Sequence, residues 1–220
     1  DPVDKTVLAN EQVIDGHADR SGAKVERKLL KQWFFTITDY ADDLLDDIKD
    51  LDWPERVKQQ QINWIGKSHG SLVKFPVVDS KKVIDVYTTR IDTLFSGTFL
   101  VLAPEHPMVA ELTTTDQKNE VEKYVETAQS KTDTDRLEAK EKTGVFTGSY
   151  VTNPANDEKM PVWIADFVLG GYGTGAVFAD AHDERDVELA RKYNIPLKQS
   201  LEPVTGTPQE NPEFRRSIVA

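Results

Sequence analysis

Hydrophobic and polar positions follow several different periods along this chain. Short apolar pairs separated by glycine turns between Val7 and Val25 predict brief strands and turns. From Tyr40 to Leu51, apolar residues recur at helical spacing opposite a row of aspartates, which predicts an amphipathic helix with an acidic face. Such carboxylates can bind a divalent cation, but we interpret them as a solvated surface. Pro54 and Gly66 mark the start and the end of a second predicted helix.

The pattern becomes strand-like after Gly70, where β-branched and aromatic residues are frequent. Apolar stripes at helical spacing predict helices over 116–129 and 183–193, and the charged segment 133–142 predicts either a helix or a loop. We expect strands at 72–78, 83–87, 98–102, 145–151, 160–164 and 176–179.

Strands interleaved with helices at irregular spacing predict a mixed α/β or α+β fold, with a curved sheet or β-barrel core and surrounding helices. We expect three parts: an N-terminal arm over 1–70, a main domain over 71–196 and a C-terminal linker or tail over 197–220. Proline, glycine and threonine between Glu202 and Pro208 are typical of a linker.

Composition excludes several classes of protein. The 220 residues carry 38 Asp and Glu against 27 Lys and Arg, a net charge of −11, which argues against non-specific nucleic-acid binding but still permits binding of one RNA end. The absence of cysteine excludes thiolate catalysis and Cys-based zinc sites, and the four histidines show no paired metal-ligand spacing, so we predict no metal site.

No apolar run reaches the roughly 18 residues of a membrane span, and residues 1–30 lack signal-peptide features. We therefore expect a cytoplasmic protein without a membrane partner.

Three polar segments beside predicted strands are candidates for chemistry. In the first, Tyr87–Phe95, threonine hydroxyls, the Arg90 guanidinium and the Asp92 carboxylate can line a pocket for a polar ligand. The alternative interpretation is a strand end followed by a helix that Asp92 or Thr93 caps.

The second segment, Gly170–Val177, is rich in glycine but leads into a predicted strand, and no Lys-Ser or Lys-Thr pair follows. This makes a nucleotide-binding loop a poor interpretation. A turn that allows a ligand to approach backbone amides fits better, with a plain hairpin turn as the alternative.

The third segment, Ala181–Asp186, opens the last predicted helix. Asp183 and Asp186 lie three residues apart near the positive end of that helix, where their charged forms suit an ammonium ligand. The alternative is that Asp183 caps the helix while Asp186 faces water. His182 can orient a water molecule or simply form a hydrogen bond in the turn. A further strand-to-helix segment, Leu102–Val109, has a histidine with no evident partner.

Together these motifs resemble a known family. Six segments occur in order between Ser71 and Pro196, and they are similar to the editing insertion, connective polypeptide 1, of leucyl-tRNA synthetase. Valyl and isoleucyl enzymes share the threonine-rich and Gly-Thr-Gly elements, whereas the Lys-Glu-Lys-Thr-Gly-Val-Phe and Ala-His-Asp-Glu-Arg-Asp runs favour the leucyl branch. The six segments are 88–95, 102–107, 140–148, 161–166, 171–177 and 181–186.

The resemblance implies an aminoacyl-tRNA deacylase of class I synthetase editing-domain type. The expected reaction is hydrolysis, by a positioned water, of the ester between tRNA(Leu) and isoleucine, valine, methionine or norvaline. The His-x-Gly-His and Lys-Met-Ser-Lys-Ser motifs of leucine–tRNA ligase are absent from the chain. We therefore expect ATP and Mg to be used only by a full-length parent, and we expect editing to need no cofactor. The implied partners are the 3′ end of charged tRNA(Leu) and the remainder of a synthetase chain.

The resemblance also implies roles for individual residues. Asp186 is expected to bind the substrate ammonium, and Thr93 to exclude correct leucine by its bulk. The remaining implied catalytic residues are Thr88, Thr89, Arg90 and Asp183, and the implied substrate-binding residues are Tyr172, Gly173 and His182.

The sequence departs from the family at two places. Ile91 stands where proline is usual, and the usual Met-Ala-Val-Pro-Ala-His is shortened by one residue at 178–182, without its proline. A one-residue deletion at a strand end moves the following side chains to the opposite face of the sheet, unless the turn changes its conformation to compensate. The alternative function is therefore a non-catalytic tRNA-docking domain with a disabled pocket. We also expect Trp33, Phe34 and Leu45 in the arm to be partly exposed.

Overall fold

The computed structural model describes residues 1–26, 28, 31 and 33–198, and its contacts divide the chain into two compact units. One unit comprises Asp1–Glu26 together with the chain from Gly70 onward, and the other comprises residues 27–69. The predicted tail over 197–220, with the linker-like segment 202–208, lies outside the described residues except for Leu197 and Lys198.

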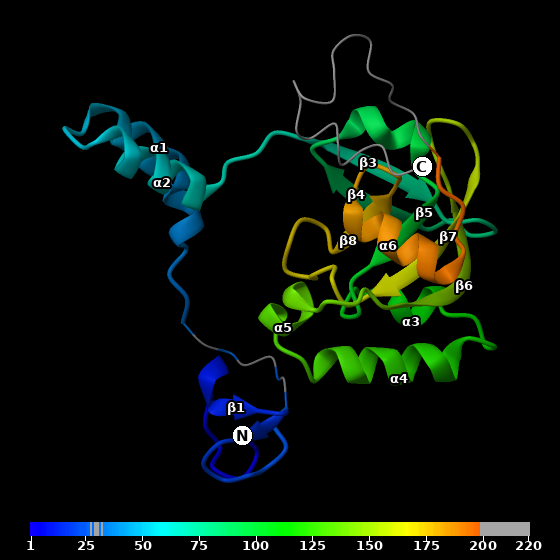
Figure 1. Cartoon of the computed structure of the whole chain (residues 1–220), viewed down its shortest axis with the longest axis horizontal. Helices are drawn as coiled ribbons and strands as arrows, with labels where there is room; N and C mark the ends of the chain where they lie inside the picture. Colours follow the sequence, from blue (N-terminus) through cyan, green and yellow to red (C-terminus); the bar gives the residue numbers. More distant parts are fainter. Residues whose placement is uncertain (27, 29–30, 32, 199–220) are drawn as a thin grey trace. The chain divides into compact units, whose positions relative to one another are not determined.

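A four-stranded sheet with the order β6-β7-β5-β8 forms the centre of the larger unit (Figure 1). Its strands are β5 (Phe99–Leu102), β6 (Gly144–Thr152), β7 (Lys159–Ala165) and β8 (Ala176–Ala179). β5 runs parallel to β7 and antiparallel to β8, and β6 pairs antiparallel with β7. All four residues of β5 are buried, which explains why this strand is an uninterrupted apolar run.

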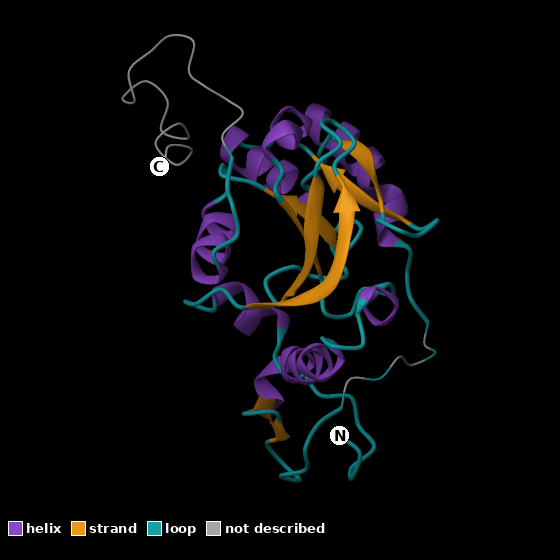
Figure 2. Cartoon of the chain, turned by 90° about the vertical axis from the view of Figure 1, so that its right-hand side faces the viewer, coloured by secondary structure: helices purple, strands orange, loops and turns teal. Residues whose placement is uncertain are grey.

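A hairpin of β3 (Ser71–Pro76) and β4 (Val83–Thr88) packs beside this sheet. β4 contacts β8, and β3 contacts β6, where the isolated bridge between Val77 and Val151 forms. The hydrogen-bonded ladders nevertheless leave the hairpin separate from the four-stranded sheet, so no closed barrel forms among the described strands. The expected mixed α/β fold with a curved sheet is confirmed, and the strands bend strongly in Figure 2. A register shift between Phe146 and Tyr150 in β6 accompanies this bend.

Helices and the hairpin cover the two faces of the sheet. Leu100 and Leu102 of β5 pack in one core with the hairpin, α3 (Val109–Leu112) and α4 (Lys118–Gln129). Phe99 and Val101 point to the other face and pack against α6 (Glu184–Tyr193), drawn in orange in Figure 1. The alternation of β5 side chains therefore fixes which helices lie on which face. The charged segment after α4 contains the helix α5 (Asp133–Glu138).

The smaller unit is a helical pair. It contains η2 (Ile37–Tyr40), α1 (Ala41–Asp47), η3 (Ile48–Asp50) and α2 (Glu55–Ile65), so both predicted helices are confirmed. Pro54 precedes α2, and Gly66 ends it with φ at 65°. Among the described residues of this unit, only Ile48 is buried. Trp33 and Phe34 are exposed and Leu45 is half-buried, as expected.

The N-terminal residues form short elements, as the glycine turns predict. They are η1 (Asn10–Gln12), β1 (Val13–Ile14) and β2 (His17–Ala18), with β1 and β2 paired antiparallel. Across the part of the chain that the structure describes, no helix is long and apolar enough to cross a bilayer.

Candidate functional site

The threonine-rich segment begins where β4 ends, at Thr88. The Thr88 hydroxyl accepts the Arg90 backbone N–H at 3.0 Å, and the Arg90 guanidinium donates to the Asp92 carboxylate at 2.9 to 3.2 Å. The hydrogen bond from Arg90 lowers the pKa of Asp92, so this carboxylate stays charged. The short helix η4 (Ile91–Ser96) then starts without a side-chain cap. The predicted capping by Asp92 or Thr93 is therefore wrong, because Asp92 binds the Arg90 side chain instead.

Thr93 is buried inside this segment, with 2% of its surface exposed. Its hydroxyl donates backward to the Arg90 carbonyl at 3.0 Å. The buried Ser96 hydroxyl donates to the Thr93 carbonyl at 2.7 Å and lies 3.4 Å from Nδ1 of His182. These contacts join the threonine-rich segment to the turn before α6, which is 86 residues later in the chain.

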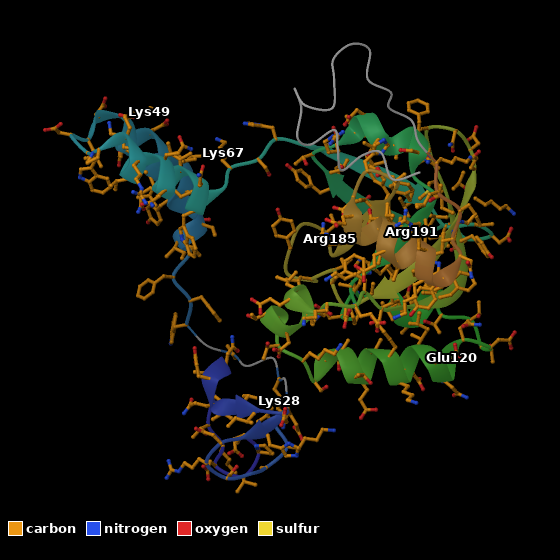
Figure 3. The ribbon with its side chains drawn as sticks, in the orientation of Figure 1. Lys28, Lys49, Lys67, Glu120, Arg185 and Arg191 are labelled. Carbon is orange, nitrogen blue, oxygen red and sulfur yellow. The ribbon has the colours of Figure 1, made fainter. Side chains whose placement is uncertain are left out.

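Asp183 and Asp186 occupy two different environments at the start of α6. The Asp183 carboxylate caps the helix by accepting the Arg185 N–H at 2.9 Å, and it also binds the Arg185 guanidinium at 3.0 and 3.1 Å (Arg185 is labelled in Figure 3). Burial raises the pKa of Asp183, but the bonds and charge of Arg185 outweigh this and lower it overall. The capping interpretation of Asp183 is therefore confirmed.

Asp186 is buried rather than solvent-facing, with 7% of its surface exposed. One of its oxygens accepts the Asp180 backbone N–H at 3.3 Å. Burial, followed by the charges of Asp183 and Asp180, raises the pKa of Asp186 well above its ordinary value. The alternative in which Asp186 faces water is wrong. Removal from water therefore has a larger effect on the pKa of this carboxyl than the favourable helix N-terminus has.

A tight turn through Asp180 follows β8, at the place where the sequence is one residue shorter than the family pattern. Its carboxylate accepts the His182 backbone N–H at 2.6 Å and lies 3.1 Å from Nδ1 of the same histidine. The other ring nitrogen, Nε2, is buried and has no hydrogen-bond partner. The turn thus fixes the His182 ring and leaves one acceptor available to a donor that enters the site.

The glycine-rich loop links β7 to β8 but is not a hairpin turn, since β5 lies between these two strands in the sheet. Gly175, with φ at +70°, leads directly into β8, so the predicted strand after the glycines is confirmed. A side chain added at Gly173 would place its Cβ 4.0 Å from Cβ of Tyr87, the residue before Thr88. The loop therefore lies against the threonine-bearing end of β4.

The threonine-rich segment contacts both other candidate segments, which flank β8: Tyr87 faces Gly173 before the strand, and Ser96 contacts His182 after it. Hydrogen bonds link Thr88, Arg90 and Thr93 with each other, and Ser96 and Asp180 extend the chain of contacts to His182 and Asp186. Thr89 and Tyr172 are exposed, Tyr172 at 82%, and extend from the buried part of the site toward solvent. Sequence reasoning missed Ser96 and Asp180. A sequence signal for Asp180 was present, because this residue lies in the segment 178–182, where the chain lacks the proline that is usual in the family.

A cavity of about 530 Å³ lies elsewhere, between α3 and α4, and is lined by none of the predicted site residues. Its walls include Val109, Val121 and Val125. Within the described residues, no group of three or more histidine and acidic side chains is arranged to hold a metal ion.

Comparison with known proteins identifies the family. The model of the leucyl-tRNA synthetase editing domain matches residues 62–218. The chain belongs to the leucyl-tRNA synthetase editing-domain family. A solved structure, the ternary complex of Agrobacterium radiobacter K84 agnB2 LeuRS with tRNA and LeuAMS, is similar to it with a TM-score of 0.71 and 42% identity. The match covers 94% of this editing-domain chain and 26% of that synthetase chain, so the chain spans about a quarter of that protein's length.

Proposed function

We propose that this chain hydrolyses the ester bond between a wrong amino acid and the 3′ end of tRNA(Leu). The observation that carries the proposal is the buried Asp186 carboxyl, held beside Asp180 and Asp183 at the start of α6. A buried acid next to two other acids is unfavourable by itself, but it becomes favourable when a cation neutralises it. The α-ammonium group of an aminoacyl ester is such a cation.

The surrounding groups support ester hydrolysis. A water molecule adds to the ester carbonyl, the bond from the carbonyl carbon to the ribose oxygen breaks, and that oxygen takes up a proton as the free acid leaves. The hydroxyls of Thr88 and Thr89 and the guanidinium of Arg90 supply donors for the charge that develops on the carbonyl oxygen. The neighbouring ribose hydroxyl can help to orient the water. This scheme needs no cofactor.

Selection against leucine is assigned to Thr93. A synthetic site distinguishes substrates that differ by one methylene by only about 1 to 3 kcal/mol, so a second site must reject what the first admits. The buried Thr93 is held by its bond to Arg90 and offers a fixed obstacle to the leucine side chain. The proposed substrates are the isoleucyl, valyl, methionyl and norvalyl esters of tRNA(Leu).

The proposed partners are the charged 3′ end of tRNA(Leu) and the remainder of a leucine–tRNA ligase, with the cytoplasm as the location. The tRNA complex of the similar agnB2 LeuRS supports the first partner. The exposed aromatic side chains of the smaller unit support the second, since exposed apolar surface often marks a protein–protein contact. They are Trp33, Phe34, Phe35 and Trp64.

Deacylation of Ile-tRNA(Leu) and Leu-tRNA(Leu) by the 220-residue chain tests the proposal. We expect selective hydrolysis of the isoleucyl ester and a loss of about 100-fold in Asp186→Ala, because the ammonium group loses its buried counter-charge. Glu184→Ala is the matched control, since Glu184 is an exposed acid in the same helical turn. Saturable binding of tRNA(Leu) without turnover would contradict the hydrolase function and support the alternative of a non-catalytic docking domain. Equal loss in both variants would contradict the role of Asp186.

A further inference from the structure

A buried arginine lies beside the start of the glycine-rich loop, in the charged segment predicted as a helix or a loop. Arg136 of α5 is 1% exposed. Its Nε donates to the Asp166 carbonyl at 2.6 Å, and its Nη2 donates to the Val168 carbonyl at 2.8 Å. Both terminal nitrogens also donate to the Glu105 carboxylate, at 3.0 and 3.3 Å. A buried guanidinium is tolerated only when its charge and its donors are matched in this way.

Glu105 connects Arg136 to the glycine-rich loop. The carboxylate oxygen that faces Nη1 of Arg136 also accepts the Gly170 backbone N–H at 3.0 Å. The two groups are in such close contact that a Cβ added at Gly170 would lie 2.5 Å from Cγ of Glu105. Burial raises the pKa of Glu105, but Arg136 and the Gly170 amide outweigh this and lower it, so the carboxylate stays charged.

The loop is thus held at both of its ends. Gly170 is bound by Glu105, and the Gly175 carbonyl accepts the Ala103 N–H at 2.9 Å. Tyr172 and Gly173 lie between these two points. Tyr172 is exposed, and Gly173 faces Tyr87 of β4. A shift of the anchor would therefore move the loop relative to the threonine-bearing strand end.

We propose that Arg136 is a positioning residue for substrate binding: through Glu105 it fixes the 170–175 loop, and with it Tyr172 and Gly173, against the end of β4. This inference rests on the proposed hydrolysis of mischarged tRNA. A guanidinium suits the role because it forms a planar fork of two parallel bonds and so fixes orientation as well as charge. Arg136 does not touch the substrate. Its effect passes through Glu105 and the loop backbone.

The test compares Arg136→Lys, which keeps the positive charge but loses the fork, with Lys131→Gln as a matched control. Lys131 binds the Asp166 carboxylate at 2.7 Å, at the same end of β7, but bonds to neither Glu105 nor Gly170. The first readout is KM and kcat for Ile-tRNA(Leu). The second is amide hydrogen exchange at Gly170, Tyr172 and Gly175, with amides of the buried β5 as the internal reference. Glu105→Gln, which retains an acceptor for Gly170, replaces Arg136→Lys if the lysine variant does not fold.

For Arg136→Lys we expect KM to rise about tenfold while kcat changes less than about threefold, with faster exchange confined to the loop amides. For Glu105→Gln we expect the same pattern at about threefold in KM. The control should match the unmodified chain in both readouts. Unchanged loop exchange, or faster exchange that extends equally into β5, would overturn the positioning role. If the unmodified chain hydrolyses no ester, the proposed function fails, and the exchange data still decide whether Arg136 fixes the loop.

Discussion

Nδ1 of His182 lies 3.1 Å from a carboxylate oxygen of Asp180, two residues earlier in the turn that leads into α6. Because a carboxylate only accepts hydrogen bonds, this contact places the proton of a neutral imidazole on Nδ1 and leaves Nε2 as an acceptor. Nε2 is buried without a partner. An unpaired buried acceptor is destabilising, and a donor from a bound substrate or from a water molecule removes that penalty.

We predict that Asp180→Asn lowers kcat for Ile-tRNA(Leu) by about 10- to 100-fold without unfolding the chain. The backbone N–H and Nδ1 of His182 both face the same Asp180 oxygen, Oδ1, so an amide that turns its nitrogen to this position donates to Nδ1 and stabilises the other tautomer of His182, at the expense of the bond from the backbone N–H. The ¹⁵N chemical shifts of the imidazole report the tautomer, and thermal unfolding reports stability. A change of tautomer with unchanged kcat would exclude His182 from the reaction.

The raised pKa of Asp186 predicts a dependence of stability on pH. Between pH 3.8, the ordinary pKa of the group, and its higher folded-state pKa, the folded chain keeps a proton that the unfolded chain loses. The folded state therefore binds more protons, and the contribution of Asp186 to the free energy of unfolding falls as pH rises from 3.8 toward the folded-state pKa. Asp186→Asn removes this contribution. We expect the variant to be more stable than the unmodified chain at pH 7, and we expect this difference in the free energy of unfolding to be smaller at pH 4.

Urea unfolding of both chains from pH 4 to pH 8 measures this difference. Glu184→Gln is the control, because its exposed carboxyl lies in the same turn of α6. The difference between Asp186→Asn and the unmodified chain should grow with pH, whereas the control difference should stay constant. A constant difference for Asp186→Asn would show that its carboxyl titrates normally in the folded chain.

The strands and helices were predictable because local pattern determines them. Apolar runs such as Phe99–Leu102 and the Pro54 to Gly66 helix carry their own start, stop and period signals. The order of the strands was not predictable, because insertion of β5 between β7 and β8 depends on contacts between segments distant in sequence. That order is also what excludes the hairpin interpretation of the glycine-rich loop.

The candidate site was predictable by residue type but not by environment. The resemblance identified Thr93, His182 and Asp186, and the structure brings their segments together. Their burial was not visible in the sequence: the pattern left open whether Asp186 faces water, and it predicted only a helix or a loop around Arg136. Both side chains are buried because tertiary packing decides which charges find partners away from water.

Tryptophan fluorescence tests the exposure of the smaller unit. Trp33, Trp53 and Trp64 are exposed in it, whereas Trp163 of β7 packs against Tyr193 with ring centroids 4.8 Å apart. We expect Trp163→Phe to remove the blue-shifted emission that iodide quenches poorly, and Trp33→Phe to remove only red-shifted, readily quenched emission. Trp33→Phe should change the free energy of unfolding by less than about 0.5 kcal/mol. Emission from Trp33 that resists iodide would show that the arm buries this side chain.

Thr93 provides the sharpest test of selectivity, because its methyl and hydroxyl groups have separable effects. The methyl group contributes bulk, and the hydroxyl binds the Arg90 carbonyl at 3.0 Å. We expect Thr93→Ala to hydrolyse Leu-tRNA(Leu) at least about tenfold faster than the unmodified chain, since loss of a methylene-sized obstacle is worth about 1 to 3 kcal/mol. Thr93→Ser, which keeps the hydroxyl, should admit leucine almost as well, and Thr93→Val, which keeps the bulk, should still reject it. If instead the valine variant hydrolyses the leucyl ester and the serine variant does not, exclusion depends on the hydrogen bond to Arg90 that shapes η4, and the bulk of Thr93 is not the selective element.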